Sequence, residues 1–123
     1  MSSLPDTLDG WLARLEKQHP TTIDLGLERV REVAVRMSLG KPAKQVISVA
    51  GTNGKGSTVA FIESIARAGG FKVGAFTSPH LLSYNERVRI DGADASDADL
   101  VAAFNAIEAA RGEISLTYFE AGT

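Results

Sequence analysis

The chain has 123 residues, 44% hydrophobic and 23% charged, which is typical of one globular unit with a modest core and excludes a disordered chain. Lys and Arg number 13 against 15 Asp and Glu, so the net charge of -2 argues against nucleic-acid or membrane partners. Cysteine is absent, which excludes disulfides, thiolate metal sites and a cysteine nucleophile. With neither a secretory signal nor a membrane-spanning apolar run, we expect a cytoplasmic protein.

Two amphipathic helices are predicted in the first third of the chain. Apolar residues at helical spacing predict a helix that ends near residues 18–20: Leu8, Trp11, Leu12 and Leu15. A second apolar stripe predicts a helix that Gly40 and Pro42 terminate: Leu27, Val30, Ala34 and Met37.

The middle of the chain predicts a strand, a glycine loop, a helix and a second strand, in that order. The run of residues 46–50 is short, mostly apolar and rich in β-branched side chains, as in a buried parallel strand. The helix after the loop has one apolar face and ends at Gly69-Gly70; that face consists of Val59, Ile62, Ile65 and Ala66. "FKVGAFTS" then begins another strand, so we expect a βαβ unit with a mostly parallel sheet in an α/β fold.

The last part of the chain predicts a strand and two more helices. "ERVRIDG" alternates apolar and charged residues and leads into an Asp91-Gly92 turn. A capping sequence over residues 96–99 precedes an apolar stripe of Leu100, Phe104 and Ile107, closed by Arg111-Gly112. Thr117 and Glu120 have capping-box spacing three residues before the chain stops. We expect part of a longer chain; the alternative is a small α/β domain whose end frays.

The loop in "VISVAGTNGKGST" departs from the strict phosphate-binding pattern G-x-x-x-x-G-K-[ST]. Val49 stands where the first glycine belongs, and Gly56 separates Lys55 from Ser57. A glycine loop between a strand and a helix can still turn backbone N–H groups and a helix dipole toward an anion. Phosphate binding is therefore predicted, and a tight turn with a solvated lysine is the alternative.

"GTNGKGST" resembles the phosphate loop of the folylpolyglutamate synthase and dihydrofolate synthase family, a branch of the Mur ligase superfamily in which a glycine follows the lysine. "TIDLGLERV", "TSPHLLSYNERVRIDG" and "ISLTYFE" support this resemblance. The resemblance extends over residues 1–123. It implies that these residues form the first part of a P-loop-containing, Mur-ligase-like ATP-binding domain, which has a three-layer α/β architecture. The rest of that domain, with further metal ligands and adenine contacts, and the C-terminal ligase domain have no counterpart.

The resemblance implies an ATP- and Mg²⁺-dependent ligase that adds L-glutamate to dihydropteroate or tetrahydrofolate through an acyl phosphate. It implies a catalytic role for Lys55 and ATP contacts along the loop: Thr52, Asn53, Gly54, Lys55, Gly56 and Ser57. We expect little or no activity from this chain alone, because an acyl phosphate needs a closed cleft that excludes water. We expect the full-length protein to be a monomer. The alternatives are a non-catalytic nucleotide-binding chain and a P-loop NTPase of another class.

Ser78 matches the metal-ligating serine of the family, at the carboxyl end of a predicted strand, where α/β sheets place ligands. A turn-forming serine before Pro79 is the alternative. His80 is expected to be a structural hydrogen-bonding residue. Arg87 and Arg89 are expected to be solvent-facing strand charges, and a carboxylate-binding role is the alternative.

For the pterin-bearing substrate, the resemblance points to an early and a late segment: Thr22, Ile23, Asp24 and Leu25, and Thr117, Tyr118, Phe119 and Glu120. Both combine apolar and polar groups, as small-molecule pockets do. The alternatives are that Asp24 caps the second helix and that Thr117 and Glu120 only form a capping box.

Overall fold

A computed structural model describes residues 3–18 and 26–123. The chain divides into two compact units. The first, the helical unit, comprises Met1–Pro42 and Asp97–Thr123, and the second, the sheet unit, comprises Ala43–Ser96. The predicted phosphate loop belongs to the sheet unit, whereas the late predicted substrate segment belongs to the helical unit.

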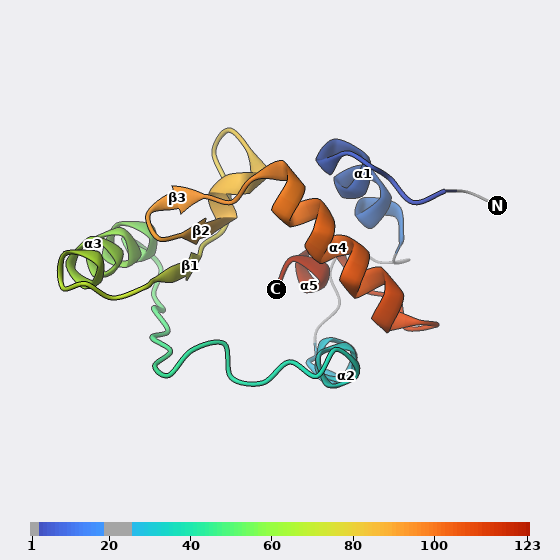
Figure 1. Cartoon of the computed structure of the whole chain (residues 1–123), viewed down its shortest axis with the longest axis horizontal. Coiled ribbons are helices and arrows are strands. Elements are labelled where there is room, and N and C mark those ends of the chain that lie inside the picture. Colours follow the sequence, from blue (N-terminus) through green and yellow to red (C-terminus); the bar gives the residue numbers. More distant parts are fainter. Residues whose placement is uncertain (1–2, 19–25) are drawn as a thin grey trace. The chain divides into compact units, whose positions relative to one another are not determined.

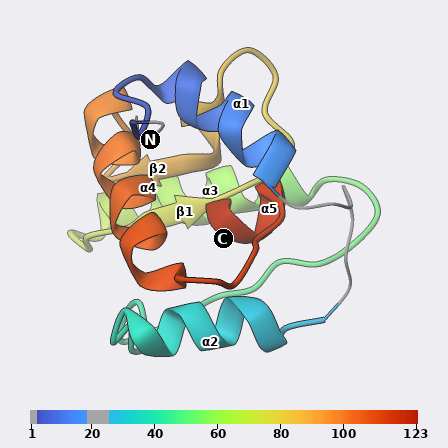
Figure 2. The same ribbon diagram turned by 90° about the vertical axis from the view of Figure 1, so that its right-hand side faces the viewer.

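The helical unit contains α1 (Leu8–Gln18), α2 (Glu28–Arg36), α4 (Asp97–Arg111) and α5 (Tyr118–Gly122) (Figures 1 and 2). Helix α4 packs against α1 and α2, and α1 also contacts α5. The buried side chains come from all four helices and the segment before α5: Leu8, Trp11, Leu15, Val33, Leu100, Phe104, Leu116, Thr117 and Ala121. This core confirms the predicted apolar faces of α1 and α4.

Helix α1 begins after Thr7, whose hydroxyl accepts a hydrogen bond from the Gly10 N–H at 3.1 Å. Its buried residues recur at i, i+3 and i+7, the spacing that places side chains on one face of a helix. Trp11 is 1% exposed and its ring lies 5.9 Å from that of Phe104 on α4, measured between centroids. The contact between these two rings joins the first helix to a helix about 90 residues later.

The inward face of α2 differs in part from the prediction, since Val30, Ala34 and Met37 of the predicted stripe are half-buried. Val33 is its buried residue, whereas Leu27, expected on the inner stripe, is exposed at the N-cap position without a side-chain cap. The helix is short, so its packing against α4 rather than its apolar spacing decides which residues turn inward. Asp24, the alternative cap, lies outside the described residues.

The sheet unit contains α3 (Lys55–Ala68), β1 (Gly74–Phe76), the 3₁₀ turn η1 (Tyr84–Arg87), β2 (Val88–Ile90) and β3 (Ala93–Asp94). The strands lie in the order β1-β2-β3, and both pairings are antiparallel. Asp91 and Gly92 connect β2 to β3 with φ values of 47° and 84°. Two positive φ angles are what a two-residue hairpin turn requires, so the predicted turn is confirmed.

The predicted parallel pairing is not what the described residues form. Residues 46–50 have no strand assignment, and β1 pairs with β2 antiparallel, with Gly74 opposite Ile90 and Phe76 opposite Val88. A strand exists only where a neighbour accepts and donates its backbone hydrogen bonds. Val46 and Ile47 are exposed, so this apolar run has no such neighbour among the described residues.

Helix α3 packs against β1 with part of its predicted face. Val59, Ile62 and Ala66 are half-buried, but Ile65 is 71% exposed, contrary to expectation. The buried residue of the helix is instead Glu63, at 7% exposure.

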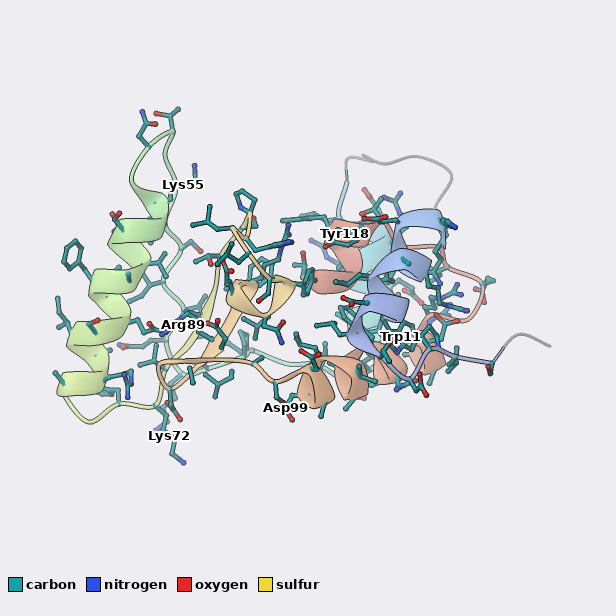
Figure 3. All side chains as sticks on the ribbon, turned by 90° about the horizontal axis from the view of Figure 1, so that it is seen from above. Trp11, Lys55, Lys72, Arg89, Asp99 and Tyr118 are labelled. Atoms are coloured by element: carbon teal, nitrogen blue, oxygen red, sulfur yellow. The ribbon has the colours of Figure 1, made fainter. Side chains whose placement is uncertain are left out.

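Arg89, labelled in Figure 3, lies on β2 and is paired with Glu63. Arg89 is therefore half-buried and ion-paired, and the prediction of a solvent-facing charge was wrong. Arg89 Nε lies 3.1 Å from each carboxylate oxygen of Glu63, and its Nη1 lies 2.8 Å from Asp94 Oδ1. The hydrogen bond to Glu63 is the main reason that the pKa of Arg89 is raised. The pair joins α3 to the sheet.

Candidate functional site

The predicted phosphate loop leads directly into the N-terminus of α3. Gly54 occupies the N-cap position with φ 78°, and Gly51 has φ 146°. Both angles favour glycine, which has no Cβ to clash. The N–H groups of Lys55, Gly56 and Ser57 form the first turn and have no acceptor within the helix. The loop therefore presents backbone donors at the positive end of a helix dipole.

The side chains of Lys55, Ser57 and Thr58, at the start of α3, differ in whether they face the loop. Lys55 Nζ donates a hydrogen bond to the Gly51 carbonyl, so the ammonium crosses the loop. Thr58 Oγ1 donates to the Gly54 carbonyl at 2.8 Å and is thereby turned back onto the helix. Ser57 is exposed and is the remaining hydroxyl at the helix start.

Ser78 follows β1, whose pairing with β2 continues through the hydrogen bond from Thr77 N–H to the Arg87 carbonyl at 2.9 Å. A short turn reverses the chain between α3 and β1, so the start of α3 and the end of β1 lie at the same end of the sheet unit (Figure 1). Ser78 is exposed there. The described residues contain no group of three or more His, Cys, Asp or Glu that could hold a metal, so Ser78 is a single candidate ligand.

His80 makes structural contacts, as expected. Its Nδ1 accepts a hydrogen bond from Arg87 Nε at 2.9 Å, and its ring lies edge-on to Tyr84 at 5.8 Å between centroids. The Arg87 guanidinium lies 5.2 Å from the Tyr84 ring centroid, within cation–π range. Arg87 therefore holds the backbone that follows Ser78.

The Glu86 carboxylate organises the same loop. It accepts backbone N–H hydrogen bonds from Leu81 at 2.9 Å and from Leu82 and Ser83 at 2.8 Å each. These bonds, led by that from Leu81, lower the pKa of Glu86 below its ordinary value. They also fix a loop on which Leu81 and Leu82 are 90% and 94% exposed.

Acidification should release this loop. Because the pKa of Glu86 is lowered on folding, its stabilisation is complete above the unfolded-state pKa and is lost as the pH falls through the lower folded-state pKa, below the ordinary range of a glutamate carboxyl. We expect the amide NMR shifts of Leu81, Leu82 and Ser83 to move together in that range. In the Glu86→Gln variant these amide shifts should no longer change with pH in that range. The control is Glu16→Gln, since Glu16 is exposed on α1, and this variant should retain the change. Shifts that titrate in Glu86→Gln as in the native chain would refute this.

The predicted late substrate segment forms the capping box that the sequence indicated. Thr117 Oγ1 accepts the Glu120 N–H at 3.1 Å, and Glu120 Oε1 accepts the Thr117 N–H at 3.0 Å. Thr117 is buried, Tyr118 is half-buried and Phe119 is 51% exposed. Of the four, Phe119 is the large apolar residue that is exposed. The early segment, residues 22–25, lies outside the described residues.

Sequence reasoning missed two side chains that organise these segments. Glu86 follows Ser83 by three residues, and this S-x-x-E spacing could have indicated its capping role. Arg29 pairs with Glu120, which lies 91 residues later, and the sequence around Arg29 does not indicate this partner. Only the folded chain reveals such a pair.

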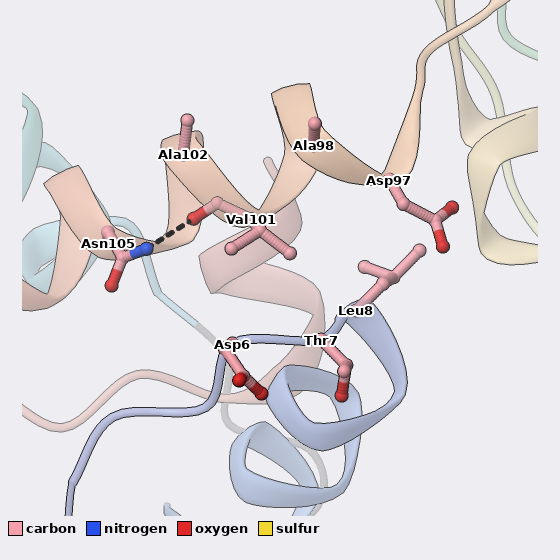
Figure 4. A pocket seen from close by; sticks show the side chains of 8 residues that line it. All are labelled: Asp6, Thr7, Leu8, Asp97, Ala98, Val101, Ala102 and Asn105. Atoms are coloured by element: carbon pink, nitrogen blue, oxygen red, sulfur yellow. Dashed lines mark hydrogen bonds between the residues drawn. The ribbon is translucent and has the colours of Figure 1, made fainter.

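The starts of α1 and α4 border an open pocket of about 510 Å³, and none of the residues that line it is a predicted site residue (Figure 4). The residues that line it are Asp6, Thr7, Leu8, Asp97, Ala98, Val101, Ala102 and Asn105. Two carboxylates line it, and the Asn105 amide is bonded to the Val101 carbonyl at 3.0 Å. Such a lining does not suit a phosphate. Within the described ranges, no helix is both long and apolar enough to cross a membrane.

Comparison with known proteins identifies relatives of much greater length. The dihydrofolate synthase/folylpolyglutamate synthase of Escherichia coli is 56% identical over 116 residues, which are 94% of this chain and 28% of that protein. No protein-family model matches. The chain is homologous to the dihydrofolate synthase/folylpolyglutamate synthases. It spans less than a third of the length of these curated relatives.

Solved structures of this family superpose closely on the chain. E. coli FolC in complex with DHPP and ADP has a TM-score of 0.94 and 52% identity over 99% of this chain and 30% of its own. The bifunctional enzyme of Yersinia pestis, complexed with AMPPNP and Mn ion, has a TM-score of 0.91 at the same identity, over 99% of this chain and 30% of its own. The expected resemblance is therefore confirmed.

Proposed function

We propose that this chain supplies part of the ATP- and substrate-binding machinery of a cytoplasmic ligase that adds L-glutamate to dihydropteroate and to tetrahydrofolates. The family consists of ATP-dependent ligases. The observation that carries the proposal is the 52% identity, over 99% of the chain, to a structure that holds DHPP and ADP. A shared fold alone would not support a function, but here about half of all positions are also shared.

In this proposal, loop 51–57 acts as a phosphate loop. The ATP phosphates lie at the start of α3, where three backbone N–H groups have no acceptor within the helix, and Lys55 moves from the Gly51 carbonyl to the transferred phosphate. Residues 46–50 pair as a parallel strand within a longer Mur-ligase-like domain. The exposure of Val46 and Ile47 supports this pairing, because apolar strands of parallel sheets are buried on both faces.

The reaction proceeds in two steps. A carboxylate oxygen of the pterin-bearing substrate attacks the γ-phosphorus of ATP, and ADP leaves, which forms an acyl phosphate. The glutamate amine then attacks the acyl carbon, loses a proton and expels phosphate, which forms the amide. Lys55 and the α3 N–H groups neutralise the charge on the transferred group. Mg²⁺ adds charge neutralisation when bound, and Ser78 is the residue of this chain proposed to hold it.

The substrate site in this proposal includes Thr117, Tyr118, Phe119 and Glu120, with Thr22, Ile23, Asp24 and Leu25 from the early segment. Phe119 offers an exposed ring on which a planar pterin or benzoyl group can stack. The buried Thr117 and the bonded Glu120 carboxylate hold this ring in place rather than present free polar groups. The structure thus favours Phe119 as the direct contact of the late segment.

The test combines binding and turnover on the 123-residue chain. Calorimetric titration should show saturable binding of ADP, and fluorescence titration should show binding of dihydropteroate. Phosphate release should stay near background, since the chain spans 28% of its E. coli relative. Failure to bind ADP would contradict the phosphate loop, and phosphate release that needs neither dihydropteroate nor glutamate would indicate an NTPase of another class. Nucleotide binding without dihydropteroate binding would favour a non-catalytic nucleotide-binding chain.

A further inference from the structure

Helix α5 is held in place from outside. It has five residues, Tyr118–Gly122, and a helix of this length is not stable by itself. Arg29, in the first turns of α2, donates from Nη2 to Glu120 Oε2 at 2.8 Å and from Nε to Glu120 Oε1 at 3.3 Å. The Glu120 side chain is 9% exposed and that of Arg29 is 26% exposed. The ion pair is thus a shielded contact inside the helical unit.

The geometry of this pair fixes orientation as well as distance. Two parallel hydrogen bonds from a planar guanidinium hold a carboxylate in one plane. The same carboxylate accepts the Thr117 N–H at 3.0 Å, so its plane also sets the turn that begins α5. Ala121 is buried while Phe119 is 51% exposed, so this turn leaves Phe119 on the exposed side of α5.

We propose that Arg29 is a positioning residue for the pterin-bearing substrate. Through Glu120 it holds the Thr117–Glu120 turn so that Phe119 presents its ring to the substrate. This role rests on the proposed function, because it requires that the late segment binds dihydropteroate. Arg29 itself acts through Glu120 and touches no substrate.

Four variants separate positioning from folding. Arg29→Met leaves a buried carboxylate unpaired, which destabilises the unit for reasons unrelated to the ligand. The double variant Arg29→Met with Glu120→Gln removes that charge, and the Gln amide oxygen can still accept the Thr117 N–H. Arg29→Lys keeps the charge but loses the fork. Arg31→Met, at an exposed position of the same helix, is the matched control.

The measurements are the dissociation constants for dihydropteroate and ADP and the melting temperature. Dihydropteroate binding is followed by the fluorescence of the single tryptophan, Trp11. We expect Arg29→Met to bind dihydropteroate about tenfold more weakly with unchanged ADP affinity, and Arg29→Lys to recover part of the loss. The double variant should regain the native melting temperature but not the native dihydropteroate affinity. Arg31→Met should behave as the native chain.

Two results would overturn the inference while leaving the proposed function intact: native dihydropteroate affinity in Arg29→Met, or a double variant that regains affinity together with melting temperature. The latter would reduce the pair to a structural contact. If the native chain binds ADP but not dihydropteroate, the substrate part of the proposed function fails and the positioning role fails with it.

Discussion

Replacing Lys55 by methionine should weaken ADP binding to the chain by about 30-fold, as expected for losing one charge-assisted hydrogen bond to phosphate. Lys55 is the only cationic side chain between residues 51 and 58, and it already lies across the loop at the Gly51 carbonyl. The backbone N–H groups and dipole of α3 persist in the variant, so residual binding is expected. Isothermal titration calorimetry at constant ionic strength measures the effect.

Lys72→Met is the matched control for this experiment. Lys72 belongs to the same sheet unit but lies at its opposite end from Lys55 (Figure 3). Removing either lysine changes the net charge equally, so a general electrostatic effect would weaken binding in both variants. Equal losses in the two variants would refute a specific phosphate contact, as would native affinity in Lys55→Met.

Replacing Trp11 by alanine should lower the free energy of unfolding of the helical unit by about 3–5 kcal/mol, the usual cost of removing a large buried aromatic side chain. The indole is 1% exposed, packs on Phe104 and lies 5.8 Å beneath the Arg14 guanidinium carbon. Small domains have about 5–15 kcal/mol of stability in total, so this loss is a large share. Urea unfolding followed by far-ultraviolet circular dichroism measures it without needing tryptophan fluorescence.

Trp11→Phe separates the loss of volume from the loss of the indole N–H. Within the part of the chain that the structure describes, Trp11 Nε1 has no hydrogen-bond partner, so its removal costs little. Phenylalanine keeps most of the ring contact with Phe104 and should recover most of the stability lost in Trp11→Ala. A cost below about 1 kcal/mol for Trp11→Ala would contradict the central place of this side chain in the core.

Features that depend on neighbouring residues were predictable from the sequence. Helix α1 begins at Leu8 and α4 at Asp97, where apolar spacing and capping residues placed them. The Asp91-Gly92 turn and the Thr117–Glu120 capping box formed as predicted. Of the candidate site, the helix that follows the glycine loop was also predicted correctly, although it begins at Lys55, two residues before Ser57.

Features that depend on distant partners were not predictable. The apolar run 46–50 matches a parallel strand equally well whether or not a neighbour pairs with it, and the described strands pair antiparallel. Ile65 has the spacing of a core residue, yet it is exposed, while the charged Glu63 is buried because Arg89 neutralises it.

The sequence by itself determined where α1 and α4 begin and where the chain turns, because these depend on contacts between residues a few positions apart. Only the tertiary structure decided which side chains are buried, how the strands pair and that Arg29 holds Glu120 at the predicted substrate segment. Those outcomes need groups up to 91 residues apart to meet, and the same local pattern is compatible with many such partners.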